Sequence, residues 1–201
     1  MSPLPPDHFE ALYRQGRDPW RMEGSWYEER KRSLLLACLP ARHYASAYEP
    51  GCGEGLFTQL LATRCQTLLA ADVSELAVHS TQARLAGMPQ VQCLRHVLPQ
   101  DWPAGPFDLV VLSELLYYLD AERLQVLVAR LLPSLLPQAT VVACHWRHAI
   151  EGCALDGMQV QRQLHEALGL PRVLQLHDAD FCIDVWERGH GRSLALREGR
   201  A

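Results

Sequence analysis

The chain has 201 residues, of which 48% are hydrophobic and 21% are charged, and its formal net charge is −4. These values are typical of one globular domain with its own core, and they argue against binding nucleic acid through a broad positive surface. The longest apolar runs are far too short to span a bilayer, and the proline-rich residues 1–7 lack the basic region of a secretory signal. We therefore expect no nucleic-acid partner and no membrane association.

Seven cysteines are scattered through apolar segments without a CxxC pair. An odd number of such residues predicts reduced, mostly buried thiols and a cytoplasmic location. Structural zinc usually needs closely spaced ligand pairs. His145 and His148 would share a metal only within a helix, and the residues before them have the pattern of a strand. We expect no metal site.

Two helical segments are predicted within residues 9–39, separated near 16–22 by Gly, Asp and Pro. Ser25 is expected to cap the second helix, with Glu28 completing a capping box. We expect residues 1–40 to form a helical lid over a ligand site.

From residue 45 onward, strands and helices alternate. Strands are predicted at 45–49, 67–72, 91–96, 107–113, 140–146, 173–177 and 181–187, and helices at 56–64, 74–85, 122–136 and 157–168. This alternation predicts an α/β fold of three layers, Rossmann-like, with a seven-stranded, mostly parallel sheet and helices on both faces. We expect the core to span residues 41–188 and the polar residues 189–201 to form a flexible tail.

A glycine-rich loop follows the first predicted strand. Gly51, Gly53 and Gly55 give the chain the freedom to turn sharply and let a ligand approach the backbone. A dinucleotide site would have its third glycine at the position of Leu56, and a P-loop would continue with Gly-Lys-Ser/Thr. Glu49 would repel a pyrophosphate but attract an amino or sulfonium group. The pattern therefore favours S-adenosylmethionine (SAM) over NAD, although a tight turn alone is the simpler alternative.

Asp72 ends the second predicted strand, 21 residues after Gly51. A carboxylate at this place can accept hydrogen bonds from both hydroxyls of a ribose. Alternatively, its charge favours the N-terminus of the helix that Ser74 caps. Together with the glycine loop, Asp72 indicates a nucleoside site.

These motifs resemble those of the seven-stranded SAM-dependent methyltransferases, and more narrowly the nodulation protein S (NodS) family. The first motif is Glu49 with the GxGxG of residues 51–55, the ribose ligand is Asp72, and residues 107–119 resemble the fourth-strand motif. The narrower resemblance rests on residues 18–20, 25–31 and 113–119, and the similarity extends over about residues 7 to 188. It implies N-methylation of the free amine of a partly deacetylated chito-oligosaccharide.

The resemblance also implies roles for residues at later strand ends. His96 and Val97 would lie against the adenine, with Val97 offering an apolar contact and a backbone N–H, while Ser113 and Glu114 would line the methionine part of SAM. His96 is alternatively a half-exposed strand end, and Glu114 a surface carboxylate.

On the acceptor side, the candidates are Tyr117, Tyr118, His145, Trp146 and Arg147. Tyr117 and Tyr118 would point to different faces of a helix, so that one packs and the other contacts the ligand. Tyr117 is the catalytic candidate of the two, and His145 would serve as the base, since the pKa of an ordinary histidine is about 6.5. A hydrogen-bonded structural histidine is the alternative.

From the lid, Arg30 would bind the SAM carboxylate, and Trp20 or Trp26 would cover the site. Trp26 and Arg30 share one helix face, and Tyr27 and Lys31 share another. Alternatively, the aromatic residues pack on the core and Arg30 lies in solvent.

The sequence thus predicts a SAM-dependent methyltransferase acting on a small molecule, with an amine as the first choice of acceptor. The protein would be a monomer or homodimer. The alternatives are an O- or S-methyltransferase, or a SAM-binding regulatory subunit without turnover.

Overall fold

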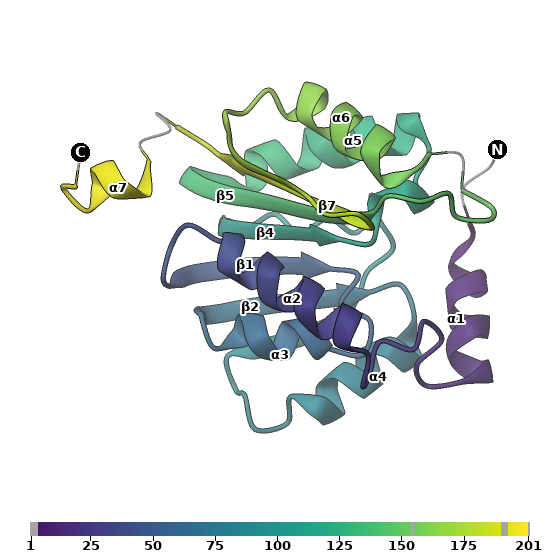
Figure 1. Cartoon of the computed structure of the whole chain (residues 1–201). Coiled ribbons are helices and arrows are strands. Elements are labelled where there is room, and N and C mark those ends of the chain that lie inside the picture. Colours follow the sequence, from purple (N-terminus) through teal and green to yellow (C-terminus); the bar gives the residue numbers. More distant parts are fainter. Residues whose placement is uncertain (1–3, 154, 190–192, 201) are drawn as a thin grey trace.

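A computed structural model describes residues 4–153, 155–189 and 193–200. Its centre is a seven-stranded sheet in the order β3-β2-β1-β4-β5-β7-β6, in which β7 is antiparallel to both neighbours and the other pairs are parallel (Figure 1). The strands are β1 (Tyr44–Pro50), β2 (Cys65–Asp72), β3 (Val91–Arg95), β4 (Phe107–Ser113), β5 (Leu135–Trp146), β6 (Arg172–His177) and β7 (Phe181–Glu187). The predicted α/β class and strand number are confirmed.

Helices cover both faces of the sheet (Figure 1). They are α1 (Pro6–Gln15), α2 (Trp26–Cys38), α3 (Leu56–Ala62), α4 (Glu75–Arg84), α5 (Ala121–Leu131), α6 (Gly157–Leu168) and α7 (Leu194–Arg197), with 3-10 turns η1 (Leu116–Tyr118) and η2 (Leu132–Ser134). Figure 1 shows α1 apart from the two helical layers, beside the carboxyl ends of the parallel strands.

The core is divided in two by the alternation of side chains along the strands. On β4, Val110 and Leu112 pack with the apolar faces of α5 and α6, whereas Leu109 and Val111 pack with those of α2 and α3. All four side chains are fully buried. A central parallel strand is apolar on both faces for this reason, as its uninterrupted hydrophobic run predicts.

Most predicted boundaries differ from the structure by one or two residues, and three elements match at both ends: β4, α6 and β7. The largest difference is β5, which begins at Leu135, where the sequence pattern assigns the end of a helix. The predicted N-caps are present, since Ser25 and Ser74 accept hydrogen bonds from the backbone three residues later. The reciprocal half of the box at Ser25 is not formed among the described residues, because the Glu28 carboxylate binds Lys31 instead.

A short turn joins β6 to β7 at the same edge as the carboxyl end of β5. Asp178 in this turn pairs with Arg30 of α2 at 2.8 Å, and Asp180 lies 2.9 Å from the His148 ring. The turn therefore connects the end of the sheet to the N-terminal helices.

The expected flexible tail includes the one-turn helix α7, and residues 190–192 and 201 of that tail lie outside the described residues. No helix in the described part of the chain is long and apolar enough to cross a membrane. All seven cysteines are free, four of them buried and three partly buried. Within the same residues, no cluster of three or more His, Cys, Asp or Glu side chains is arranged to hold a metal ion.

Candidate active site

A cavity of about 580 Å³ lies at the carboxyl ends of β1, β2 and β4. Helices α1 and α2, which belong to the N-terminal part of the chain, form another wall of this cavity, and Phe9, Tyr13 and Tyr27 are among the residues that line it. Ligands bind at this edge in open α/β sheets because the strand order reverses there. Here β1 lies between β2 and β4, so the cavity occupies the switch point.

The glycine loop forms the floor of one end of the cavity. Gly51 and Gly53 line it with positive φ angles of 75° and 55°, in the left-handed region that favours glycine. Gly55, also with positive φ, does not line the cavity. A Cβ at Gly55 would lie 2.9 Å from the Cγ2 atom of Thr81 on α4. The three glycines therefore serve two purposes: two expose backbone to the cavity, and Gly55 allows close helix packing.

Glu49 is a buried acid at the end of β1, and it lines the cavity. Its Oε2 atom has no hydrogen-bond partner among the described residues. Burial raises the pKa of Glu49 to about 8, because the low-dielectric interior disfavours the charged form. A cation bound beside it would supply the missing partner and favour ionisation.

Asp72 lies at the carboxyl end of β2 and lines the same part of the cavity. Its carboxylate accepts hydrogen bonds from the backbone N–H groups of Gly53 and Ser74, both at 3.0 Å. Burial raises its pKa, and these two hydrogen bonds act in the opposite direction. Asp72 therefore supports the helix N-terminus, as one alternative drawn from the sequence predicts, and it also faces the cavity, where the ribose role stays a prediction.

His96 and Val97 line the cavity after β3. The His96 ring nitrogen Nδ1 lies 3.0 Å from the Tyr48 hydroxyl. The Val97 N–H donates to Asp101 Oδ2 at 2.8 Å, so this donor, expected to be free for an adenine, is paired within the loop.

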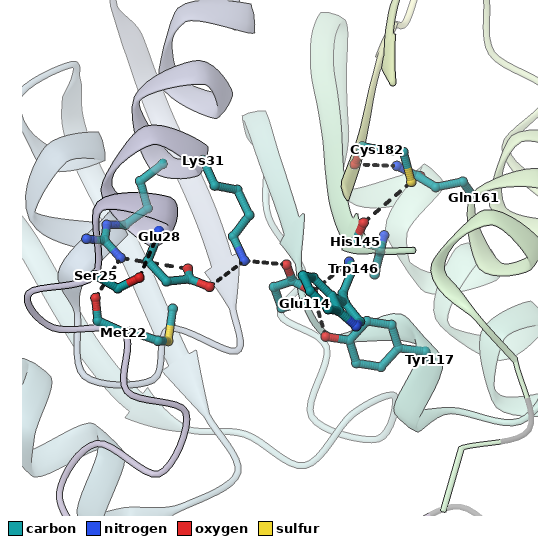
Figure 2. A network of polar contacts seen from close by, with 11 residues as sticks. Met22, Ser25, Glu28, Lys31, Glu114, Tyr117, His145, Trp146, Gln161 and Cys182 are labelled. Atoms are coloured by element: carbon teal, nitrogen blue, oxygen red, sulfur yellow. Dashed lines mark hydrogen bonds and ion pairs between the residues drawn. The ribbon is translucent and has the colours of Figure 1, made fainter. Parts of the chain in front are cut away.

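Ser113 is the last residue of β4 and Glu114 follows it, and both line the opposite side of the cavity. Glu114 has φ of 52°, which is uncommon outside glycine and concentrates at functional sites. Its carboxylate accepts hydrogen bonds from Lys31 Nζ at 2.7 Å, the Tyr117 hydroxyl at 2.6 Å and the Trp146 N–H at 2.9 Å (Figure 2). Three donors from three segments thus fix the carboxylate in position.

Lys31 is the centre of this network. It is only 5% exposed and lies between Glu28 at 3.0 Å and Glu114 at 2.7 Å (Figure 2). Burial acts to lower the pKa of Lys31, but the two carboxylates outweigh it, so the pKa ends above its usual range. Burial likewise acts to raise the pKa of Glu114, but Lys31 and the Tyr117 hydroxyl bring it below its usual range. Both groups are therefore charged at neutral pH.

Tyr117 and Tyr118 both line the cavity, although the sequence suggests that one packs and the other contacts a ligand. Tyr117 is bound to Glu114, and Tyr118 packs edge-on against Phe9 of α1 at a centroid distance of 4.9 Å. Trp146 also lines this side of the cavity.

His145 is not placed to act as a base in the cavity. It is fully buried outside the cavity lining, and its Nε2 atom accepts the Leu116 N–H at 3.2 Å. Burial lowers its pKa to about 4, so the ring is neutral at physiological pH. The structure corrects our assignment of His145 to the alternative, a structural histidine behind Tyr117.

Trp26 and Arg30 also lie away from the cavity. The Trp26 side chain is 72% exposed, and Arg30 pairs with Asp178. The helix turns its other face inward, so that Glu28, Lys31 and Arg32 line the cavity. Trp20 does line the cavity mouth, packed edge-on against Tyr13 at 5.5 Å.

Sequence reasoning missed Glu28, Lys31, Arg32 and Tyr13 as site residues. The i, i+3 spacing of Glu28 and Lys31 was the available indication of their ion pair. Nothing in the sequence connects Lys31 to Glu114, 83 positions away. Arg147, predicted on the acceptor side, instead donates to the Asp178 carbonyl and lies outside the cavity lining.

Known proteins share this architecture and part of this sequence. The profile of the Nodulation protein S (NodS) family matches residues 9–165. Nodulation protein S of Rhizobium tropici is 34% identical over 140 residues, which cover 68% of this chain and 59% of that protein. Nodulation protein S of Bradyrhizobium diazoefficiens is 31% identical over 128 residues, covering 62% of this chain and 61% of that protein. The matched regions thus span less than two thirds of these two relatives.

Two solved structures extend the comparison. A candidate methyltransferase from Pseudomonas syringae is 42% identical, with a TM-score of 0.73 over 82% of this chain and 100% of that one. The N-methyltransferase NodS from Bradyrhizobium japonicum WM9, in complex with S-adenosyl-L-homocysteine (SAH), is 23% identical, with a TM-score of 0.77 over 90% of this chain and 98% of that one; this likeness establishes the fold. Because the family profile spans most of its length, the chain belongs to the Nodulation protein S family.

Proposed function

We propose that this chain is a SAM-dependent methyltransferase that N-methylates an amine on a small molecule, and that the amine belongs to an amino sugar. Membership in the Nodulation protein S family supports the activity, and the P. syringae and B. japonicum structures are a candidate methyltransferase and an N-methyltransferase. The observation that carries the proposal is the buried Glu49 carboxyl, which faces the cavity with one unpartnered oxygen.

SAM fits the β1–β2 end of the cavity on chemical grounds. Glu49 offers an anion to a positively charged group, and Gly51 and Gly53 expose backbone where a side chain would intrude. Asp72 still has acceptor capacity for ribose hydroxyls after its two backbone hydrogen bonds, since a carboxylate has about four acceptor positions. His96 and Val97 would lie beside the base.

The SAM carboxylate needs a cationic partner. The sequence analysis names Arg30, whereas the position of Arg32 in the structure favours Arg32. Arg32 lines the cavity, and its side chain is 11% exposed. Its nearest acceptors are distant, with the Met22 carbonyl at 3.5 Å and Glu28 Oε2 at 3.9 Å. A buried guanidinium with such weak partners can bind a carboxylate in a bidentate manner. We assign Arg32 this role in place of Arg30.

The acceptor would occupy the β4–β5 end. Phe9, Tyr118 and Trp146 give this end flat apolar surfaces, against which the C–H face of a sugar ring can pack. The ionised Glu114 beside them favours an amine over a hydroxyl or a thiol, since the protonated form of an amine is a cation that an anion attracts, whereas hydroxyls and thiols have no such form at neutral pH.

When bound, SAM would supply a methyl group on a positively charged sulfur. A neutral amine can attack that carbon in line, so that the S–CH3 bond breaks, SAH leaves, and the methylated nitrogen releases its proton to water. The chain contributes orientation, which supplies roughly 7–11 kcal/mol in well-aligned reactions. The acceptor nitrogen must be unprotonated when it attacks. Glu114 can orient an N–H of that nitrogen, and the aromatic walls restrict water around it.

A turnover assay with matched acceptors tests the proposal. The protein is incubated with SAM and a tetramer of β-1,4-linked glucosamine, and SAH release is followed, with the fully N-acetylated tetramer as control. We expect SAH only with the free amine. Equal release from both tetramers would indicate O-methylation, and SAM binding without release from any amine, hydroxyl or thiol would indicate a regulatory subunit.

The location is a separate part of the proposal. We place the protein in the cytoplasm, where its seven free thiols would remain reduced. To test this, cells of the source organism are fractionated, and the free thiols of the protein are counted after unfolding. We expect the protein in the cytoplasmic fraction with seven reactive thiols. Its presence in another fraction would contradict the proposal.

A further inference from the structure

The buried ion pair between α2 and the end of β4 has a function that the cofactor site does not require. We propose that Lys31 is a positioning residue that holds the Glu114 carboxylate at the cavity wall, where Glu114 receives the amino group of the acceptor. This inference rests on the proposed function and assigns its acceptor-binding group.

The position of Glu114 is fixed more firmly than a surface carboxylate requires. Its backbone adopts the left-handed conformation, which is unfavourable for a residue with a Cβ and is retained only where surrounding contacts impose it. Its N–H donates to the Cys144 carbonyl at 2.8 Å, continuing the β4–β5 ladder by one bond. This backbone turn directs the chain into η1, and Glu114 lines the cavity at the point of the turn.

The three donors to Glu114 leave part of its carboxylate available. Oε2 accepts from both Tyr117 and Trp146, while Oε1 accepts from Lys31 alone. Oε1 therefore has a second acceptor position, and the side chain is 21% exposed. An amino group in the cavity can donate to this oxygen without displacing any of the three bonds.

Lys31 determines whether that oxygen carries charge. The titratable groups that face Glu114 come from α2, η1, β5 and β7: Tyr27, Glu28, Lys31, Tyr117, Tyr118, Cys144, His145 and Cys182. Burial acts against ionisation of Glu114, and His145 is neutral at physiological pH. Lys31 is thus the nearby full positive charge that keeps Glu114 ionised, and its ammonium is itself fixed by Glu28.

The experiment compares Lys31→Met and Lys31→Arg with Arg162→Met, a control that removes an exposed cation on α6, away from the cavity. Steady-state kinetics use SAM and the glucosamine tetramer, and calorimetry measures SAH affinity. For Lys31→Met we expect the KM of the tetramer to rise at least tenfold while the SAH affinity changes less than threefold. Lys31→Arg should restore most of the loss, and Arg162→Met should match wild type.

The pH profile separates positioning from simple support of the fold. Without Lys31 the pKa of Glu114 rises, so the acidic limb of kcat/KM should move to higher pH in Lys31→Met. In a Glu114→Gln background the same Lys31 substitution should have no further effect on KM, because the two residues act as one unit. An unchanged acidic limb, or fully additive effects, would overturn the proposal.

A measurement without turnover distinguishes this inference from the proposed function. With ¹³C-labelled glutamate, the Glu114 carboxyl signal is identified by its loss in Glu114→Gln and followed against pH. Its midpoint should move upward by at least one pH unit in Lys31→Met and stay in place in Arg162→Met. An unmoved midpoint refutes the role of Lys31 even in an active enzyme, whereas wild-type protein that binds no SAH refutes the proposed function instead. A fall in SAH affinity of tenfold or more with an unchanged KM would make Lys31 a cofactor ligand.

Discussion

At the β1–β2 end of the cavity, one continuous loop and the next strand end supply the wall, whereas at the β4–β5 end the wall is assembled from α1, α2, η1 and the end of β5. The first end is organised by backbone geometry: glycines with positive φ and a carboxylate bound to two N–H groups. The second is organised by side chains that meet from distant segments. Substitutions in the glycine loop or at Asp72 should therefore alter cofactor binding, and those of Glu114 or its hydrogen-bond partners should alter acceptor binding.

The largest expected effect is that of Gly53→Val. A Cβ at this position would lie 3.2 Å from the Tyr13 hydroxyl, and φ is 55°. We expect SAH affinity measured by calorimetry to fall about 100-fold or more, which is about 2.8 kcal/mol. Gly87→Val, at an exposed glycine with open space around it, is the control and should bind normally. Tight SAH binding by Gly53→Val would show that the loop does not contact the cofactor.

Asp72→Ala should follow in size. Loss of charge-assisted hydrogen bonds to the ribose is worth about 1.5–3 kcal/mol, or about tenfold to 150-fold in SAH affinity. Some loss of melting temperature is expected too, since the Gly53 and Ser74 N–H groups lose their acceptor. Glu75→Gln, which removes an exposed charge from the first turn of the same α4 helix, is the control. Unchanged affinity in Asp72→Ala would contradict the ribose assignment.

Glu49 should make cofactor binding depend on pH. Its pKa is raised to about 8 in the free protein, so below that pH the carboxyl is protonated, and a bound cation drives the proton off. Calorimetry should show SAH affinity rising with pH up to about 8, by at most about tenfold per unit. In Glu49→Gln the slope should disappear. An equal slope in both proteins would assign the proton to another group.

The same raised pKa has a consequence for stability. In the unfolded chain the pKa of Glu49 has its ordinary value of 4.5, while in the folded protein the carboxyl retains its proton until about pH 8. The contribution of Glu49 to stability is therefore fully present below pH 4.5 and lost as pH rises toward 8. Thermal melts should show a smaller decline between these pH values in Glu49→Gln than in wild type.

Gly55→Ala tests whether the three glycines have the same function. Because φ is 77° and the new Cβ would meet Thr81, we expect a loss of about 1–3 kcal/mol in unfolding free energy with SAH affinity within about threefold of wild type. The matched variant Gly55→Ala/Thr81→Ser removes the Cγ2 atom and retains the hydroxyl that binds the Gly53 carbonyl. It should recover part of the melting temperature. A loss of SAH affinity as large as that of Gly53→Val would place Gly55 among the cofactor contacts.

Trp26→Ala should have the smallest effect. The side chain is 72% exposed at the start of α2 and turned away from the cavity, so SAH affinity and tetramer KM should both stay within about twofold of wild type. Trp20→Ala, at the cavity mouth, is the comparison and should weaken at least one of them. A large effect of Trp26→Ala would mean that α2 rotates its outer face inward when ligands bind.

The sequence was sufficient for the fold and for the placing of the glycine loop and Asp72 at one end of the cavity, because both depend on local patterns. The apolar run of β4, the N-caps at Ser25 and Ser74, and the glycine spacing are each readable within a few residues. The start of β5 was missed because the apolar residues up to Leu135 continue the helical pattern through η2, the turn that contains Pro133.

The acceptor end could be predicted only in part. Tyr117 and Glu114 follow a strand end, where function concentrates, but the helical periodicity of α2 leaves open which face turns inward. The choice of Trp26 and Arg30 over Glu28 and Lys31 was therefore wrong. The face of α2 that turns inward depends on packing against β4 and β7, which lie about 80 and 150 positions further along the chain. The position of His145 at a strand end suggested a catalytic base, but its side chain is fully buried away from the cavity.

The antiparallel direction of β7 bears on how this protein family can diversify. Because β7 runs against its neighbours, the turn at Asp178–Asp180 emerges beside the end of β5, at the same rim as Trp146. Residues inserted in that hairpin would extend the rim of the acceptor end while every strand register stays as it is. A longer turn between β6 and β7 would thus allow the protein to bind larger or longer acceptors while the sheet and its helices stay unchanged.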